Sequence, residues 1–352
     1  MDAAIASLAK MVPDIDGFIA PLVKGTPLLK GGAPDYYLSV LIAAMFPLMR
    51  FILDKTVYNW LGRKCLGFPA YKKSDDPPSA DALSRLHKFK ESAYKCGVQI
   101  FFTTLLLVVA LPKPWFTNTW LYWSDCSRLP CEAKPTLGER IVYLVELAFY
   151  SQAIPMIFLW ETKRKDRWEL FAHHVATVIL IAYSYYLNIT RVGVMVLVCH
   201  EANDIFLELA KMARYAQASE ALTTGCFIAF MLSWFATRIY TFGFIVIKST
   251  LFESYKRAQQ VNVNIEPHTT ILNGFLIFLY ILHIYWSYLI VRIAVRQLVG
   301  GELNDIREEH DEDGEEAEEI AAGGDGGDAT AVKPIALNPA KVASVGNMPS
   351  NM

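Results

Sequence analysis

Two apolar segments in the middle of this chain carry an unusual set of ionisable side chains. The first spans about residues 170–187 and contains two adjacent histidines, His173 and His174. The second spans about residues 192–210, and its ionisable residues are His200, Glu201, Asp204 and Glu208. Ionisable groups inside a membrane-spanning helix cost free energy, so by default they indicate a functional site. Imidazole titrates closest to neutral pH, and beside a carboxylate it can remove a proton from a nucleophile.

The short connector between the two segments predicts how these groups meet. Residues 188–191 can only join two antiparallel, neighbouring helices. An α-helix rises about 1.5 Å per residue, so positions equidistant from the connector lie at equal depth. The histidine pair should therefore lie level with about residues 206–207, within a turn of Asp204 and Glu208. Because residues four apart share a helix face, His200 and these two carboxylates should form one stripe that faces the histidine pair.

The motifs in and around these segments resemble those of a known enzyme family. The core run is His173-His174-x-x-Thr177, Ser184-Tyr185, Asn188, Arg191-Val192-Gly193, His200, Asp204 and Leu207-Glu208. It resembles the signature of the ceramide synthases, the longevity-assurance members of the TLC-domain family. Phe46–Phe51, Lys88–Ala93 and Pro114-Trp115-Phe116 are similar to the plant and fungal type, and the likeness covers about residues 36–298. Glu201 departs from the pattern, because the family usually has aspartate at this position.

The resemblance implies an acyltransferase that makes ceramide in the endoplasmic reticulum membrane. A sphingoid base attacks the thioester of fatty acyl-CoA, which is a co-substrate, so no cofactor is expected. The amine is protonated at neutral pH, as lysine is with a pKa of about 10.4, and must lose a proton to attack. The candidate bases are His173, His174 and His200, and Asp204 is the carboxylate expected to orient an imidazole. Either the histidine takes the proton during direct attack, or it first forms an acyl-imidazole by covalent catalysis.

The supporting polar residues each have a functional and a purely structural interpretation. The supporting set is Thr177, Ser184, Glu201, Glu208 and Arg238. The two hydroxyls either serve the site or bond backbone carbonyls of their own helix. Glu208 either faces the histidines or forms a helix ion pair with Lys211. Arg238, in a later apolar segment, either neutralises the carboxylates or extends towards the membrane surface.

A basic cluster lies just before the histidine pair. Its members are Lys163, Arg164, Lys165 and Arg167. Arginine and lysine bind phosphates, so this cluster is the candidate site for the phosphates of CoA. The same charges would also hold the loop on the cytosolic side of a membrane. The two roles are compatible, and the sequence favours both.

A metal centre is not predicted. The spacing His200-x-x-x-Asp204 would suit two ligands on one helix, and imidazole with carboxylate suits iron or zinc. Di-iron membrane enzymes require a larger set of histidine boxes than the seven histidines of this chain provide. The cysteines show no CxxC spacing that would indicate zinc. Loss of activity with a strong chelator would reopen the question.

Composition predicts an all-α, polytopic membrane protein. Hydrophobic residues make up 53% of the chain and aromatic residues 13%, gathered in runs about 20 residues long. About seven transmembrane helices are expected, at residues 36–54, 97–112, 140–160, 170–187, 192–210, 221–247 and 270–298. The fifth could instead be a buried amphipathic helix. The corresponding regions are an N-terminal segment (1–35), a first helix with a basic cytosolic loop (36–95), a TLC domain with six helices (96–299) and a tail (300–352).

Basic loops orient the expected helices. Most loop lysines and arginines lie in 55–95, 161–168 and 211–220, which places the N-terminus in the lumen and the C-terminal tail in the cytosol. Cys126 and Cys131 would then be lumenal, either as a disulfide or as two free thiols. The tail is strongly acidic at residues 308–319 and otherwise low in complexity, so it should be disordered.

Two other classes of function remain open alongside the enzyme. One is a non-enzymatic TLC-domain protein that senses lipids or chaperones lipids or proteins, although such relatives generally lack the full histidine set. The other is a transporter that uses the intramembrane charges as a relay. The expected partners are fatty acyl-CoA, a sphingoid base and membrane lipid, with no nucleic acid, and a homo- or hetero-oligomer is left open.

Overall fold

A computed structural model describes residues 2–12, 14, 16–17, 32–67 and 79–299. These residues belong to the first of two units of the chain, residues 1–309. The second unit, residues 310–352, lies outside the described residues, and so does the predicted disordered tail.

The described residues form helices and connecting segments without a β-strand, which confirms the all-α prediction. The α-helices are α1 (Asp2–Met11), α3 (Ala33–Leu53), α4 (Asn59–Cys65), α5 (Ala80–Ala110), α6 (Leu137–Leu159), α7 (Arg167–Tyr186), α8 (Thr190–Tyr215), α9 (Glu220–Trp234), α10 (Ser254–Gln260) and α11 (His268–Leu298). Three π-helices continue them, η1 (Asp54–Tyr58), η4 (Phe235–Ile247) and η5 (Ser249–Glu253). Two 3₁₀ turns, η2 (Pro114–Phe116) and η3 (Thr119–Tyr122), lie between α5 and α6.

Side-chain caps explain where several helices begin. Ser79 accepts a hydrogen bond from the Ala82 amide at the start of α5, and Ser219 caps α9 in the same way. Thr136 and Glu139 form a reciprocal capping box at the start of α6. The Glu139 carboxylate also accepts a hydrogen bond from Thr190 Oγ1 at 3.0 Å, which fixes the start of α8 against α6.

Five helical stretches of the described chain are long and apolar enough to cross a membrane, so the protein is a multi-pass membrane protein. They are Ala33–Cys65, Ala80–Ala110, Leu137–Leu159, Glu220–Gln260 and His268–Leu298. The helices α7 and α8 do not qualify, and the seven-span count is therefore not confirmed. The reason is their polar stripe, since charged and imidazole side chains lower the hydropathy of both helices.

The region predicted as a basic loop, residues 55–95, is largely helical. The first apolar helix continues through η1 and α4 to Cys65, and α5 begins at Ala80. Its basic residues pair across this helical region, as in the 2.7 Å contact between Lys90 Nζ and Asp54 Oδ2. The polar composition of this segment favours a loop, but both helices extend beyond their apolar parts into the polar sequence. Residues 68–78 lie outside the described residues.

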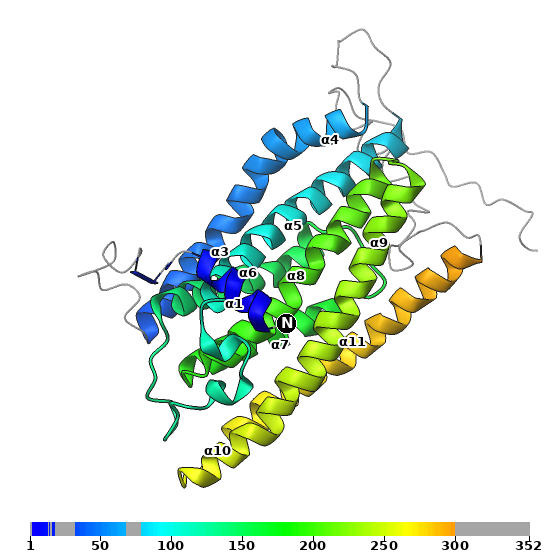
Figure 1. The fold of residues 1–352 in the computed structure, drawn as a ribbon. Coiled ribbons are helices and arrows are strands. Elements are labelled where there is room, and N and C mark those ends of the chain that lie inside the picture. The colour runs from blue at the N-terminus through cyan, green and yellow to red at the C-terminus, as the bar shows by residue number, and fades with distance from the viewer. Residues whose placement is uncertain (1, 13, 15, 18–31, 68–78, 300–352) are drawn as a thin grey trace, which may run out of the picture. The chain divides into compact units, whose positions relative to one another are not determined.

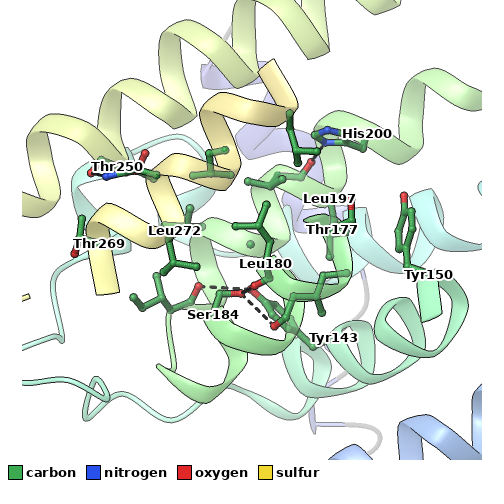
Figure 2. Close-up of a pocket in the computed structure, with 18 of the residues that line it drawn as sticks. Tyr143, Tyr150, Thr177, Leu180, Ser184, Leu197, His200, Thr250, Thr269 and Leu272 are labelled. Atoms are coloured by element: carbon green, nitrogen blue, oxygen red, sulfur yellow. Dashed lines mark hydrogen bonds between the residues drawn. The ribbon is translucent and has the colours of Figure 1, made fainter. Parts of the chain in front are cut away.

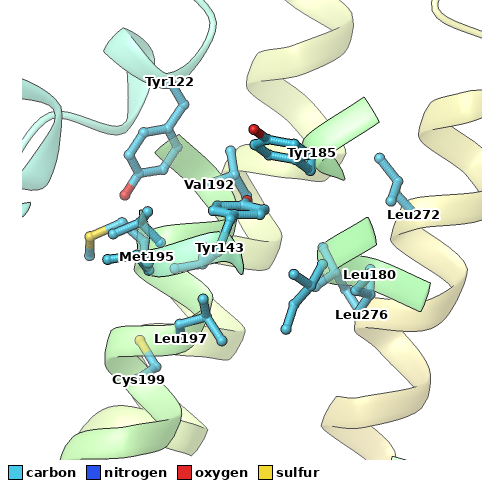
Figure 3. Packing of buried hydrophobic residues seen from close by; sticks show 14 of the residues in the cluster. Tyr122, Tyr143, Leu180, Tyr185, Val192, Met195, Leu197, Cys199, Leu272 and Leu276 are labelled. Carbon is cyan, nitrogen blue, oxygen red and sulfur yellow. The ribbon is translucent and has the colours of Figure 1, made fainter. Parts of the chain in front are cut away.

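The central hairpin helices are splayed apart. Helix α8 packs chiefly against α5 and α9, whereas α7 packs chiefly against α6 and α11 (Figure 1). Their own mutual contact is limited, because a cavity lies between them. The largest apolar cluster surrounds this region and includes Tyr143, Leu180, Tyr185, Leu197 and Leu276 (Figure 3).

Candidate active site

Three histidines from three helices converge in the interior. His173 of α7, His200 of α8 and His283 of α11 are all buried. The ring centroids of His200 and His283 lie 4.8 Å apart, and that of His173 lies 5.9 Å from His200 and 6.1 Å from His283. Aromatic rings enclose the cluster, namely Trp234, Phe242 and Trp286. The hairpin therefore brings imidazoles from the two polar segments together, but His173 meets His200 rather than the level of residues 206–207 that the spacing predicts.

Backbone carbonyls fix the tautomers of two histidines. His200 Nδ1 lies 2.6 Å from the Val196 carbonyl oxygen, and His174 Nδ1 lies 2.8 Å from the Leu170 carbonyl oxygen. A carbonyl can only accept, so each Nδ1 carries the hydrogen of the neutral ring and each Nε2 presents a lone pair. His200 Nε2 is buried and has no hydrogen-bond partner among the described residues. It is thus available as a base or as a nucleophile.

Within the described part of the chain, the histidine cluster is also a grouping that could hold a metal ion. One nitrogen from each of His173, His200 and His283 lies within 4.8 Å of the others. Zinc binds imidazole nitrogen at about 2.0–2.1 Å, so tetrahedral ligands lie about 3.4 Å apart and the cluster would have to contract. The Arg238 guanidinium, which donates to the His200 carbonyl, adds positive charge beside it. Acid–base chemistry fits these residues better than a resident cation.

Asp204 pairs with Arg238 rather than with an imidazole. Arg238 Nη2 lies 2.7 Å from Asp204 Oδ1 and 2.8 Å from the His200 carbonyl oxygen. Arg238 belongs to the π-helix η4, a conformation often found at functional sites. The structure thus differs from the expected histidine–aspartate contact, because carbonyls orient the imidazoles and Arg238 holds the carboxylate. Glu208 accepts from Lys211 at 3.3 Å, as in a simple helix ion pair.

A second buried carboxyl group accompanies Glu201. Glu201 Oε1 accepts a hydrogen bond of 2.5 Å from the Tyr150 hydroxyl, and the Tyr150 ring meets the His174 ring edge-on at 5.4 Å. Glu146 of α6 is fully buried, like Glu201, and is its electrostatic neighbour. Neither Glu146 oxygen has a hydrogen-bond partner in the part of the chain that the structure describes.

An apolar cavity extends from His200 between α7, α8 and α11. His200, Thr177 and Tyr150 lie on one side of it, and Thr250 and Thr269 lie on the other (Figure 2). Along α11 its lining runs from Thr269 to Leu279, about 15 Å at 1.5 Å per residue. That length matches one leaflet of a hydrocarbon core about 30 Å thick, so the cavity suits a single acyl chain.

The two candidate hydroxyls of α7 are used by their own helix. Thr177 Oγ1 donates to the His173 carbonyl at 2.8 Å, and Ser184 Oγ donates to the Leu180 carbonyl at 2.6 Å. Both residues line the cavity, but their hydrogen bonds match the structural interpretation. Across the cavity wall, Gly193 admits the Tyr143 hydroxyl, since a Cβ there would lie 1.7 Å from it.

The basic cluster before α7 divides into two parts. Arg164 donates two hydrogen bonds, of 2.8 and 2.7 Å, to the Asp166 carboxylate, and Trp286 Nε1 donates to the same carboxylate at 3.0 Å. Lys163 and Lys165 are exposed, and Arg167 is half-buried. Arg164 therefore anchors the loop to α11, whereas the two lysines remain accessible to an anionic ligand.

A salt bridge holds the same loop near His174. Glu161 Oε2 lies 2.9 Å from Lys95 Nζ, which also contacts Glu91 Oε1 at 2.8 Å. Burial alone would raise the pKa of Glu161, but Lys95 outweighs it and the pKa lies below its ordinary value. Glu161 therefore supplies negative charge beside His174.

At the opposite end of the hairpin, Cys126 and Cys131 form a disulfide with their Cα atoms 4.5 Å apart. The Cys131 amide donates to the Leu187 carbonyl at 2.9 Å, and Asn188 Nδ2 donates to the Cys131 carbonyl at 3.0 Å. Arg191 bonds Asp125 at 2.6 Å and thereby lowers the pKa of that carboxyl. The disulfide loop thus supports the connector between α7 and α8.

Sequence reasoning missed three residues of the site, namely Glu146, Tyr150 and His283. Glu146 and His283 are ionisable groups within predicted spans, so the membrane cost that identified the others also applied to them. The sequence does not show that α6 and α11 lie beside the hairpin. Neither helix is linked to the hairpin by a connector short enough to determine which of its residues face the site. Tyr150 carried no signal beyond its place in the Phe149-Tyr150 motif.

Several known proteins are similar in sequence to this chain. A family model described as "TLC domain" matches residues 88–292. The chain is 35% identical over 285 residues to "ASC1-like protein 1" of rice, which covers 79% of the chain and 91% of that protein. It is 35% identical over 284 residues to "Ceramide synthase LOH1" of Arabidopsis thaliana, with 78% and 90% covered. Human "Ceramide synthase 5" is 32% identical over 248 residues, with 70% of the chain and 59% of the human protein covered.

Proposed function

The chain belongs to the TLC-domain family, and on that basis we propose that it is a ceramide synthase that N-acylates a sphingoid base from fatty acyl-CoA. The broader class is an acyltransferase embedded in a membrane. One observation carries the finer proposal: His200, with an unprotonated and unpartnered Nε2, lines one end of an apolar cavity about as long as one membrane leaflet.

The cavity is the proposed site of the acyl chain. Its walls expose mainly apolar atoms, so burial of the chain is driven by the hydrophobic effect, at about 0.8 kcal/mol per methylene. With the chain towards Thr250 and Thr269, the thioester lies beside His200 and Tyr150. This places the reacting carbonyl carbon at the histidine cluster.

The sphingoid ammonium first loses one proton to solvent and becomes the free amine. As the amine nitrogen bonds the carbonyl carbon, His200 Nε2 takes a second proton from that nitrogen, and the carbonyl π electrons move to oxygen. Collapse of that tetrahedral species breaks the C–S bond, and the thiolate receives the proton from the imidazolium. In the covalent alternative a histidine nitrogen attacks first, the thiolate leaves, and the amine then displaces the imidazole.

A rapid-quench experiment separates the two routes. Enzyme would be mixed with acyl-CoA alone and quenched, and the mass of the intact protein would be measured by mass spectrometry. A mass increase equal to the acyl group supports the acyl-imidazole, and its loss in His200→Ala or His173→Ala locates it. No adduct at any time supports direct attack.

The polar end of acyl-CoA is proposed to lie at the exposed lysines before α7. Lys163 and Lys165 are free of the Asp166 contact that occupies Arg164, and a phosphate there would be only a few helical turns from His174. Arg167 completes the basic cluster. This end faces the cytosol in the proposed topology, with the N-terminus and the disulfide in the lumen of the endoplasmic reticulum. The Cys126–Cys131 bond is compatible with that oxidising side.

Expression in cells that lack ceramide synthase tests the function. The wild-type chain should restore ceramide from sphinganine, and His173→Ala and Asp204→Asn should not, at matched protein levels. If the wild type made no ceramide with both substrates supplied, the enzyme proposal would be wrong and a lipid-sensing or chaperone role would replace it.

A further inference from the structure

Among the described hydroxyls that line the cavity, that of Tyr150 differs in bonding a carboxyl group. Thr177, Ser184, Thr250 and Thr269 each donate to a nearby backbone carbonyl. The Tyr143 hydroxyl lies 3.1 Å from Ser184 Oγ and donates to the Thr190 carbonyl at 3.2 Å. The Tyr150 hydroxyl instead bonds the carboxyl group of Glu201 at 2.5 Å, and such a hydrogen bond reverses its direction when the carboxyl group is protonated.

Tyr150 also lies at the reacting end of the cavity. It lines the cavity together with Thr177 and His200, and its ring contacts that of His174. A thioester placed beside His200 Nε2 is therefore beside this phenol. The sequence motif, the proposed base His200 and the basic cluster before α7 assign no role to Tyr150.

The partner of Tyr150 belongs to a pair of acids. Glu201 and Glu146 each have no exposed surface and act on one another electrostatically. The other groups that act on Glu201 are Asp204 on the same helix and Arg238 from η4, and these two are bound to each other. Two neighbouring buried carboxyl groups cannot both be charged without a large desolvation and repulsion cost. The pair therefore retains a proton.

We propose that Tyr150 is a catalytic residue that donates a hydrogen bond to the thioester carbonyl oxygen, with Glu201 and Glu146 as its positioning residues. When the proton of the pair lies on Glu201, the direction of its hydrogen bond with Tyr150 reverses, so the carboxyl group donates to Tyr150 Oη and the phenolic hydrogen is free to point into the cavity. When the amine bonds the carbonyl carbon, the π electrons move to oxygen, and the Tyr150 O–H stabilises that oxyanion. The phenol keeps its proton throughout, and the oxyanion re-forms the carbonyl as the C–S bond breaks.

This inference rests on the proposed function, because it assumes a thioester at His200. The arrangement matches a known physical strategy, in which a buried acid stays protonated so that it can act as a hydrogen-bond donor. Loss of one oxyanion donor typically lowers kcat by about 10²–10³-fold. The acyl-imidazole route forms the same oxyanion twice, so the role of Tyr150 is independent of that choice.

Purified full-length enzyme with Tyr150→Phe tests the donor directly. We expect kcat to fall by about 10²–10³-fold while KM for acyl-CoA changes by less than about threefold, since only the developing charge loses a contact. Tyr36→Phe is the matched control: its hydroxyl also makes one interior hydrogen bond, to the Ala182 carbonyl at 2.9 Å, but outside the cavity. It should keep kcat within about twofold.

Two substitutions at Glu201 test the direction of the hydrogen bond. Glu201→Gln keeps a donor for Tyr150 Oη and should retain kcat within about tenfold, whereas Glu201→Leu removes it and should resemble Tyr150→Phe. This pair decides the question even if Tyr150→Phe does not fold. Equal activity of the Gln and Leu variants, equal loss in both, or wild-type kcat in Tyr150→Phe would overturn the proposal. An inactive wild type would instead overturn the proposed function.

Discussion

A bulky residue in the wall of the cavity should shorten the acyl chain that the enzyme accepts. Leu272, Leu276 and Leu279 all line the cavity and lie on the same face of α11. The lining of α11 is about 15 Å long between Thr269 and Leu279, and Leu272 is about 10 Å from Leu279. Leu272→Trp should therefore close the outer third and leave about two-thirds of the length.

The same reasoning predicts a stronger effect for a second substitution. Leu276 lies only about 5 Å from Leu279 along the helix, so Leu276→Trp should block most of the cavity. Ile277→Trp is the matched control, because Ile277 is adjacent in sequence but 41% exposed on the outer face of α11. Insertion of a larger side chain into a packed interior costs about 1–3 kcal/mol, but here the new ring can occupy existing space.

The assay is a competition among acyl-CoAs of graded length, with ceramide products resolved by mass. We expect the longest accepted chain to shorten by about one third in Leu272→Trp and long-chain product to disappear in Leu276→Trp. Ile277→Trp should keep the wild-type distribution. Indistinguishable products from Leu272→Trp and Ile277→Trp, at similar total activity, would refute the assignment of this cavity to the acyl chain.

Three further outcomes follow from the contacts around the site. Arg238→Met should lower the free energy of unfolding by roughly 2 kcal/mol, because it leaves the Asp204 carboxylate without its ion-pair partner. The double variant with Asp204→Asn should lose less stability, and a larger loss in the double variant would contradict this. Lys163→Ala with Lys165→Ala should raise KM for acyl-CoA several-fold at low salt, and the difference from wild type should shrink at high salt; a salt-independent difference argues against phosphate contact. Cys126→Ser with Cys131→Ser should cost roughly 2 kcal/mol by chain entropy, measured as a lower Tm than that of Cys65→Ser; equal Tm values would show that the bond adds no stability.

The hairpin that carries the site could be predicted because its evidence is local. A four-residue connector predicts two adjacent antiparallel helices whose polar residues meet. The helix rise placed the histidine pair level with residues 206–207, whereas the ring of His173 lies 5.9 Å from that of His200. The partner of Asp204 could not be found in this way. Arg238 reaches it from a π-helix, whose wider turn moves side chains off the positions that a 3.6-residue period predicts.

The parts of the site on other helices depend on long-range packing. Tyr150 and Glu146 come from α6, and His283 comes from α11, and no short connector fixes their orientation towards α8. The number of spans is not confirmed for a different reason. Helices α7 and α8 are predicted as spans from their apolar runs, but their polar stripes lower their hydropathy below that of the five apolar helical stretches of the described chain.

The central claim is that His200 Nε2 is the base or nucleophile at the head of the acyl cavity. The most direct test is kcat of purified His200→Ala, with His87→Ala, an exposed histidine of α5, as the control. The account predicts a fall of at least about 10²-fold in His200→Ala at unchanged folding, and no loss in the control. A His200→Ala enzyme that makes ceramide at the wild-type rate would contradict it.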